Sequence, residues 1–246
     1  MTAPAAARAV WREAEVVDSI AATSTARVLR LSAPGWPGSR PGQHVDVRLT
    51  AEDGYQAVRS YSLGLAGDGD TIELGVAEVP DGEVSPYLVH DIAAGDALEV
   101  LGPLGGYFVW HPDDPSPVQL IAGGSGIVPL RAMLRARLDG PASQPFRLLF
   151  SVKTPEDAIY RDELEDVGTT GGAGVTWIYT RRAPASWPGD VGRLTAEQLD
   201  AAAWPVEDDP TIFVCGPTAF VEFVARALVS RGHPAARIKT ERFGGA

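Results

Sequence analysis

The first part of the chain consists of short apolar runs separated by turn-forming residues. The runs predict strands at residues 26–31, 44–49, 58–65, 71–79 and 97–101. Between them lie clusters rich in Gly, Pro and Asp, such as Gly67-Asp68-Gly69-Asp70. One helix is predicted at residues 84–91. Strands at this spacing are typical of an antiparallel β-barrel.

The pattern changes after the proline-rich segment at residues 111–117, where apolar strands alternate with helical stretches. Strands are predicted at residues 118–122, 146–152, 175–179, 211–214 and 236–241, and helices at 127–138, 156–166, 195–200 and 218–231. Such alternation is typical of a parallel sheet with helices on both faces. The predicted fold therefore has two domains, an antiparallel β-barrel at residues 8–111 and an α/β domain with a Rossmann-like parallel sheet at residues 117–246.

Composition and charge exclude several classes of protein. The formal net charge of −11 over 246 residues argues against nucleic acid and anionic membranes as partners, because both attract basic surfaces. The single cysteine excludes an internal disulfide or an iron–sulfur cluster held by four cysteines of this chain. The scattered histidines suggest no metal site.

The chain contains no run approaching the roughly 20 apolar residues of a membrane-spanning helix. Residues 1–8 are rich in Ala and Pro and lack the apolar core of a signal peptide. We therefore expect a cytoplasmic protein.

A glycine-rich turn, Gly123-Gly124-Ser125-Gly126, lies between the first strand and the first helix of the second half. Glycines let backbone amides approach a phosphate, and Pro129 suits a first helical turn. The same residues are also compatible with a tight strand-to-helix turn that binds nothing. The second strand ends near Lys153, where a dinucleotide fingerprint usually places an acidic residue, and a cation there favours a 2′-phosphate.

Two further segments carry candidate chemistry. In Arg59-Ser60-Tyr61-Ser62-Leu63, strand alternation predicts Arg59, Tyr61 and Leu63 on one face and the two serines on the other. An arginine beside an aromatic ring can hold a phosphate and a planar ring, although the run also fits an ordinary half-exposed strand. Cys215 follows an apolar strand and precedes Gly216-Pro217, where ligands of parallel sheets collect; a lone cysteine is otherwise a small core residue.

Five motifs in this order resemble the ferredoxin–NADP reductase superfamily. They are Arg59-x-Tyr61-Ser62, Gly82-Glu83-Val84-Ser85, Gly102-Pro103-Leu104-Gly105, the segment Gly123-Gly124-Ser125-Gly126-Ile127-Val128-Pro129, and Cys215-Gly216-Pro217. The resemblance covers most of the chain. It implies a flavin-binding barrel followed by a pyridine-nucleotide domain, in a stand-alone oxidoreductase without the fused iron–sulfur domain of some relatives.

The resemblance also implies roles on the flavin side. The flavin-binding residues would be Arg59, Ser60, Tyr61, Ser62, Gly82, Val84, Ser85 and Phe243. Arg59 would contact the flavin phosphates, Tyr61 would stack on the isoalloxazine, and Ser62 would hydrogen-bond near N5. Ser85 belongs to the second phosphate segment, and it could also cap its helix.

On the nucleotide side, the implied residues are Gly123, Gly124, Ser125, Gly126, Pro129, Lys153, Thr180, Arg181, Cys215, Gly216 and Pro217. Thr180-Arg181 resembles the pair that relatives place on the 2′-phosphate of NADP, so we favour NADPH over NADH. The alternative is solvated surface charge. Arg131 and Arg135, about one helical turn apart, are expected on a solvent-exposed face rather than in a docking patch.

The implied catalytic residues are Ser62, Cys215 and Glu241. Glu241 occupies the place of a glutamate near the end of related chains. Phe243 either covers the flavin or docks the terminal strand, because three small residues follow it.

The expected activity is hydride transfer from NADPH or NADH to bound FAD, with FMN the less favoured flavin. Electrons would pass to a separate acceptor such as ferredoxin, flavodoxin, a cytochrome or an oxygenase component. Two alternatives stay open. One is a non-catalytic flavin- or nucleotide-binding electron-transfer or regulatory subunit, and the other is a reductase of free flavin or ferric chelates.

Overall fold

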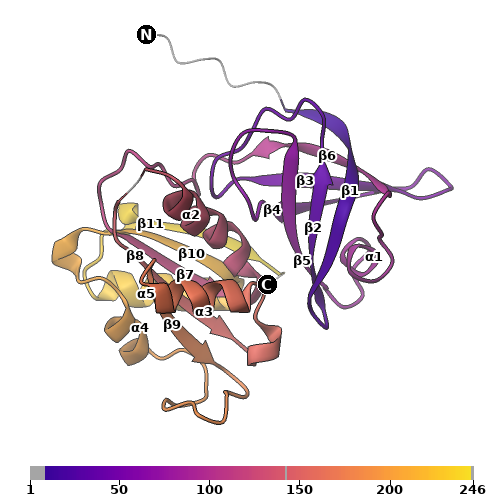
Figure 1. Ribbon diagram of the computed structural model, residues 1–246. Helices are drawn as coiled ribbons and strands as arrows, with labels where there is room; N and C mark the ends of the chain where they lie inside the picture. Colours follow the sequence, from indigo (N-terminus) through magenta and orange to yellow (C-terminus); the bar gives the residue numbers. More distant parts are fainter. Residues whose placement is uncertain (1–8, 142, 245–246) are drawn as a thin grey trace, which may run out of the picture.

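The computed structural model describes residues 9–141 and 143–244, which form two sheets lying side by side (Figure 1). The Ala/Pro-rich segment at residues 1–8, which includes the first residue of the predicted barrel domain, lies outside the described residues, as do Gly245 and Ala246. Within the described part, no helix has both the length and the apolar character needed to cross a membrane.

The first sheet is antiparallel and barrel-like, as predicted. Its strands are β1 (Val10–Thr23), β2 (Ala26–Ser32), β3 (His44–Thr50), β4 (Gln56–Ser62), β5 (Thr71–Ala77) and β6 (Ala97–Leu104). They pair in the order β4-β3-β6-β1-β2-β5. A bridge between Leu63 and Leu74 joins the two edge strands, so the sheet closes on itself at that point. The predicted helix is α1 (Ser85–His90).

Strand β1 was missing from the prediction, although it is the longest strand of the barrel. Only Ala14 and Val16 of its residues are fully buried, and charged residues such as Glu13, Glu15 and Asp18 interrupt the apolar pattern. The strand is stabilised mainly by backbone pairing with β2 on one side and β6 on the other. Pairing of this kind leaves little trace in the hydrophobic pattern.

The second sheet is parallel, as predicted, and helices cover both of its faces (Figure 1). Its elements are β7 (Val118–Gly123), α2 (Ile127–Asp139), β8 (Phe146–Val152), α3 (Arg161–Thr170), β9 (Gly174–Tyr179), α4 (Ala196–Ala202), β10 (Thr211–Pro217), α5 (Thr218–Ser230) and β11 (Ile238–Phe243). The strand order is β11-β10-β7-β8-β9. From β7 the chain adds β8 and β9 on one side and then β10 and β11 on the other, so the switch point lies between β7 and β10. Ligands of such sheets bind beyond the carboxyl ends of the strands at this switch point.

Two predicted boundaries were wrong. The helix predicted at residues 156–166 begins only at Arg161, because Pro155–Asp157 form a separate 3₁₀ turn and Tyr160 has a left-handed backbone with φ of 61°. The last strand begins at Ile238 rather than at residue 236, because residues 235–237 form another 3₁₀ turn. The strand also runs past its predicted end at residue 241 and includes Phe243.

One hydrophobic core is shared by the two domains. The barrel residues Ala26 and Val28, and the connecting Phe108 and Trp110, pack into the cluster that covers one face of the parallel sheet. A second cluster fills the barrel, and a third covers the other face of the parallel sheet. The two domains therefore meet through packed side chains.

The turn before β3 depends on a glycine that touches the interdomain connection. Gly42 has φ of 98°, and a Cβ atom there would lie 1.9 Å from the Phe108 carbonyl oxygen.

Gly42→Ala should therefore lower the free energy of unfolding by at least about 3 kcal/mol, measured by urea denaturation. Gly54 also has a positive φ, but its Cβ would meet no atom within 4 Å. Gly54→Ala is the control and should cost about 1–2 kcal/mol. Equal losses would show that the Phe108 contact contributes nothing.

Candidate active site

A cavity of about 260 Å³ lies where the barrel faces the parallel sheet. We call it the junction cavity. Its lining residues are Arg59, Ser60, Tyr61, Ser62, Gly75, Ala77, Val79, Gly82, Glu83, Val84, Ser85, Ser125, Val128, Cys215 and Phe243. The barrel supplies most of the wall. Ser125, Val128, Cys215 and Phe243 close it from the other domain, so the cavity exists only where the two domains meet.

The predicted Arg59–Ser62 motif lines this cavity from β4. Strand alternation predicts opposite faces for the side chains of Arg59 and Tyr61 and for those of the two serines, and all four residues border the cavity. The Ser60 hydroxyl donates to Oδ1 of Asp46 on the neighbouring strand β3 at 2.6 Å. The cavity thus runs along β4, which is an edge strand in the sheet order.

Arg59 is half exposed and pairs with the carboxylate of Glu83, which comes from the second predicted phosphate segment. The Tyr55 hydroxyl donates to the other oxygen of Glu83 at 3.0 Å. Arg59 also donates to the Val58 carbonyl at 2.8 Å. The guanidinium is thus held at the mouth of the cavity. Tyr61 is more enclosed, and burial raises its pKa to about 12, so its hydroxyl stays protonated.

The segment from Gly82 to Ser85 lies at the start of α1, as predicted. The expected capping role of Ser85 was wrong, because Val84 is the N-cap residue and no side chain caps the helix. The Ser85 hydroxyl instead accepts a hydrogen bond from the Val79 amide at 2.9 Å, and this bond anchors the chain that follows β5. Val84 is 1% exposed and belongs to the barrel core.

The glycine-rich loop crosses over β10 at the switch point. A Cβ atom on Gly126 would lie 2.2 Å from the Cys215 carbonyl oxygen, so this close crossing requires glycine. The Phe220 ring of α5 covers both Gly123 and Gly216, and a Cβ on either would approach the ring within 3 Å. The loop therefore fits between the strand end and an aromatic ring.

Cys215 and Glu241 are directly opposite each other on β10 and β11. Cys215 is 2% exposed, and burial raises the pKa of its thiol well above the usual range, with a further contribution from Glu241. Burial also raises the pKa of Glu241 to about 7. Its Oε2 atom is buried with no hydrogen-bond partner, and its Oε1 atom lies 3.9 Å from Nδ1 of His44. Glu241 lies next to Cys215 but does not line the junction cavity.

Phe243 is part of the terminal strand, and it also borders the junction cavity. It ends β11, where it pairs with Pro217, and it is 38% exposed. Its side chain lines the junction cavity from the nucleotide-domain side.

A second cavity, of about 710 Å³, lies beyond the ends of β8, β9 and β10, and we call it the strand-end cavity. Its lining residues are Ser151, Lys153, Thr180, Arg181, Arg193, Leu194, Pro217, Ala219, Phe220 and Phe223. The Arg181 amide donates to the Lys153 carbonyl at 2.9 Å, which holds the two predicted cationic segments side by side. Three cations line this cavity, and its described lining contains no acidic side chain.

The predicted site residues thus separate into three groups. Those of the barrel motifs, together with Ser125, Cys215 and Phe243, line the junction cavity, and Lys153, Thr180, Arg181 and Pro217 line the strand-end cavity. Gly123, Gly124, Gly126, Pro129, Gly216 and Glu241 support these walls without lining either cavity.

Sequence reasoning missed Arg193, Phe220 and Val128. Phe220 lies one helical turn after Pro217, a spacing that could have revealed it. Arg193 lies in an irregular segment, where no pattern identifies it.

The expected solvent-exposed face with Arg131 and Arg135 was wrong for Arg131. Arg131 is 9% exposed and pairs with Glu73 of the barrel and Glu163 of α3. Arg135 is more exposed and pairs with Asp139. Helix α2 faces the barrel at Arg131, so its charge lies between the domains.

Comparisons with known proteins agree with this two-part architecture. The family model described as an oxidoreductase FAD-binding domain matches residues 14–109, and the one described as an oxidoreductase NAD-binding domain matches residues 120–226. The chain is 34% identical over 208 residues to ferredoxin–NADP reductase B of Sorangium cellulosum, covering 82% of this chain and 84% of that reductase.

Two other relatives are components of larger systems by name. The chain is 31% identical over 210 residues to the glycine betaine monooxygenase reductase subunit of Chromohalobacter salexigens, covering 83% of this chain but only 56% of that subunit. The structure of a ferredoxin reductase in carbazole 1,9a-dioxygenase superposes with a TM-score of 0.84 at 27% identity, covering 97% of this chain and 70% of that one.

The fold and the matched domains define a flavin-dependent NAD(P)H oxidoreductase, with FAD as cofactor and NAD(P)H as co-substrate. The chain belongs to the ferredoxin–NADP reductase family.

The junction cavity has the chemistry that a flavin requires. Its apolar walls, such as Val79 and Val128, suit a planar ring, and Tyr61 and Phe243 place an aromatic side chain on each domain's side. Arg59 in the lining suits a phosphate, and Ser62 and Ser85 add hydroxyl groups suited to polar edges of a ligand.

The raised pKa of Glu241 generates a test of stability against pH. The folded protein keeps the Glu241 proton up to about pH 7, whereas the unfolded chain releases it near the ordinary value of 4.5. The folded state binds more protons in this interval, so the contribution of this group to stability falls as pH rises. Relative to wild type, Glu241→Gln should gain about 2–3 kcal/mol in unfolding free energy between about pH 5 and about pH 8, measured by urea denaturation.

The control for this test is Glu52→Gln, which removes an exposed carboxylate in the loop after β3. Its stability relative to wild type should stay nearly level over the same range. A flat profile for Glu241→Gln would mean that the Glu241 carboxyl ionises in the folded protein as it does in water.

Proposed function

We propose that this protein transfers hydride from NADPH to FAD held in the junction cavity and passes the electrons to a separate redox protein. The FAD-binding domain would span residues 8–111 and the nucleotide domain residues 117–246. The observation that carries the proposal is the composition of the junction cavity. Ser62 of the barrel and Cys215 of the switch point line the same small space, so groups bound by the two domains would meet there.

In the proposed site the barrel residues bind and orient the flavin. Arg59 neutralises its phosphate together with the segment from Gly82 to Ser85, and Tyr61 stacks on the ring. Ser60 and Ser62 line the same cavity, and Ser62 would donate a hydrogen bond at the polar edge of the flavin near N5. A phosphate at Arg59 competes with Glu83, whose carboxylate already holds the guanidinium.

The nucleotide side binds and orients the coenzyme. The loop from Gly123 to Gly126 and the first turn of α2 with Pro129 offer backbone amides and a positive helix end to the pyrophosphate. The first turn of α2 contains no acidic residue that would oppose it. Gly216 and Pro217 at the end of β10 are small, so they leave space for the coenzyme to pass over the strand end. Hydride transfer between the dihydronicotinamide and the flavin is the chemistry that the bound cofactors supply.

Three groups beside the cavity control its polarity. Cys215 remains a neutral thiol because of its burial, and it contributes a compact wall with no charge against the nicotinamide. Glu241 holds a proton close to neutrality and lies next to Cys215, which makes it the proposed proton donor and acceptor. Phe243 covers the cavity from the end of β11 and would exclude water from it.

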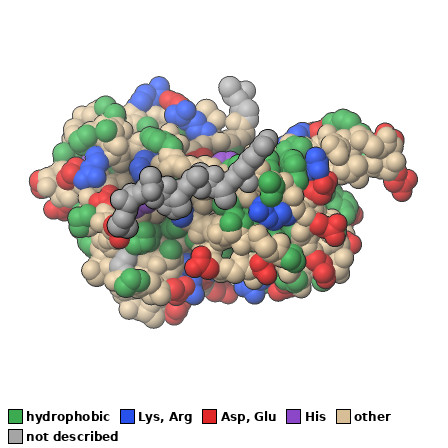
Figure 2. Space-filling view, turned by 90° about the horizontal axis from the view of Figure 1, so that it is seen from above, with side chains coloured by type: hydrophobic (Ala, Val, Ile, Leu, Met, Phe, Trp, Pro, Cys, Tyr) green, Lys and Arg blue, Asp and Glu red, His purple; other side chains and the backbone are tan. Residues whose placement is uncertain are grey.

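The proposed acceptor is a separate redox protein. Ferredoxin, an oxygenase component and a cytochrome are classes that the names of relatives support, because the relatives include a ferredoxin–NADP reductase, an oxygenase reductase subunit and NADH-cytochrome b5 reductases. Flavodoxin is a further candidate. On the face seen in Figure 2, acidic side chains lie among the basic ones, so charge on that face favours no single class.

The proposal is tested by the visible spectrum of the purified protein. We expect flavin absorbance after reconstitution with FAD, and anaerobic addition of NADPH should bleach it. Reduction of a bound flavin that stays with the protein through gel filtration would contradict the free-flavin reductase alternative. Absorbance that neither NADPH nor NADH bleaches would support the non-catalytic subunit and overturn the proposed activity.

The choice of NADPH rests on the cations of the strand-end cavity. Arg181 lines this cavity beside Lys153, whereas its neighbour Arg182 pairs with Glu156 and lies outside it. Removing a charge-assisted hydrogen bond to the 2′-phosphate costs about 1.5–3 kcal/mol, so Arg181→Ala should raise the KM for NADPH about tenfold to a hundredfold. The KM for NADH should change little, because NADH has no 2′-phosphate.

Arg182→Ala is the matched control for this prediction and should leave both KM values near those of wild type. Equal losses for NADPH and NADH in Arg181→Ala would contradict the assigned 2′-phosphate role.

A further inference from the structure

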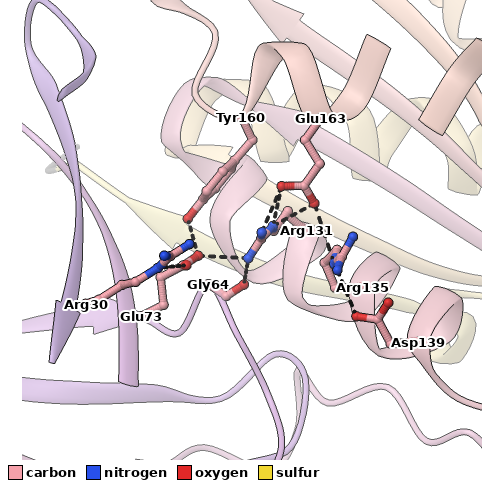
Figure 3. Close-up of polar contacts among 8 residues, drawn as sticks. All are labelled: Arg30, Gly64, Glu73, Arg131, Arg135, Asp139, Tyr160 and Glu163. Atoms are coloured by element: carbon pink, nitrogen blue, oxygen red, sulfur yellow. Dashed lines mark hydrogen bonds and ion pairs between the residues drawn. The ribbon is translucent and has the colours of Figure 1, made fainter. Parts of the chain in front are cut away.

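A group of polar and charged residues connects the two domains, and its two central members, Glu73 and Arg131, are buried (Figure 3). We call it the interdomain charge cluster, and it consists of Arg131, Glu73, Glu163, Arg30 and Tyr160. The Glu73 carboxylate is 3% exposed and comes from β5 of the barrel. Arg131 comes from α2 of the nucleotide domain and is 9% exposed. Charges this far from solvent are retained only where partners surround them.

Arg131 is held from both domains at once. Its Nη1 atom donates to the Gly64 carbonyl and to Oε1 of Glu73, both at 2.8 Å, which fixes it to the barrel. Its Nε and Nη2 atoms donate to Glu163 of α3 at 2.8–3.1 Å. Because the guanidinium is rigid and planar, one side chain fixes the direction of both contacts.

Neighbouring groups hold Glu73 in place. The Tyr160 hydroxyl donates to its Oε1 atom at 3.2 Å, and Arg30 lies 3.3 Å from its Oε2 atom. Arg131 also lies over the Tyr160 ring, 4.6 Å from the ring centre. A Cβ atom on Gly64 would lie 2.6 Å from the Tyr160 hydroxyl, so the barrel backbone at Gly64 lies closer to Tyr160 than any residue with a side chain would allow. The contact therefore has little freedom to shift.

The cluster lies one helical turn from the junction cavity. Val128 lines the cavity, and Arg131 follows it three residues later on α2, about 4.5 Å along the helix axis. The same helix begins at the glycine-rich loop. No residue of the cluster lines the junction cavity, so the cluster can act on the reaction only through the relative position of α2 and β5, which both contribute to the cavity lining.

We propose that Arg131 is a positioning residue that sets the distance between the coenzyme and the flavin by fixing α2 to Glu73 and Gly64 of the barrel. Hydride transfer requires reacting atoms about 3–3.5 Å apart, and small errors in position cost large factors in rate. The inference rests on the proposed function, because each domain binds one of the two reacting groups. A contact that fixes the domains therefore determines whether those groups meet.

The test uses the FAD-loaded protein and four variants. Glu73→Gln removes the negative charge that the barrel places against Arg131, and it leaves Arg131 paired with Glu163, so no buried charge is stranded. Arg131→Lys keeps the positive charge but loses the planar fork. The double variant combines the two. Glu165→Gln is the matched control, because it breaks the exposed Arg161–Glu165 pair within α3.

Stopped-flow reduction by saturating NADPH should slow about tenfold or more in Glu73→Gln and in Arg131→Lys. The FAD content and the dissociation constant for NADPH should stay within about twofold of wild type, since neither residue lines a ligand cavity. The double variant should be no slower than the slower single variant, because both act through one contact. Glu165→Gln should reduce at the wild-type rate.

Small-angle X-ray scattering provides a readout that needs no coenzyme. The two single variants should show a broader distribution of distances between the domains, and Glu165→Gln should match wild type. Unchanged rates with an unchanged scattering profile would overturn the proposal. So would a double variant slowed by the product of the two single effects, or a loss of FAD that accounts for the slower reduction.

The scattering result also separates this proposal from the proposed function. If the wild-type flavin is bleached by neither NADPH nor NADH, the proposed activity fails, and the scattering comparison still decides whether Arg131 and Glu73 fix the domains.

Discussion

The packing of helix α2 against strand β5 is the contact on which the rest of the site depends. Val128 lies against Gly75, where a Cβ atom would come within 2.3 Å of the valine side chain. Only glycine permits this approach, and it brings the glycine-rich loop at the start of α2 up to the barrel. The junction cavity, its lining by Cys215 and the buried Arg131 all follow from the placement of this one helix.

The two cavities differ in the ionisable groups that surround them. Beside the junction cavity, burial keeps the Cys215 thiol protonated, and it lowers the pKa of His44, which favours the neutral imidazole. The strand-end cavity instead gathers three cations without an acidic residue in its described lining. The proposed site would therefore place the nicotinamide ring at the domain junction and the 2′-phosphate of the coenzyme further out on the nucleotide domain.

Local signals in the sequence predicted most of the fold and many of the residues that line the two cavities. The alternation of strands and helices, the glycine-rich turn and the Cys-Gly-Pro segment all depend on neighbouring residues, and the structure has each of these elements where it was expected. Strand β1 was not predicted, because it is stabilised by backbone pairing with other strands rather than by a hydrophobic pattern of its own. The burial of Arg131 was not predicted, because the sequence pattern around a helical arginine is the same whether its side chain faces water or a carboxylate from another domain. Contacts between residues far apart in the chain leave no periodic trace.

The glycine at position 75 also limits how freely the two domains can be recombined. The two-domain architecture suggests that the barrel or the nucleotide domain could be exchanged for that of a relative. Here the fit between them is specific, since Gly75 accepts Val128 and Glu73 accepts Arg131 across the same boundary. A chimera that replaces one domain must keep the matching residue on each side of both contacts. Otherwise two correctly folded domains will be joined at the wrong distance from each other.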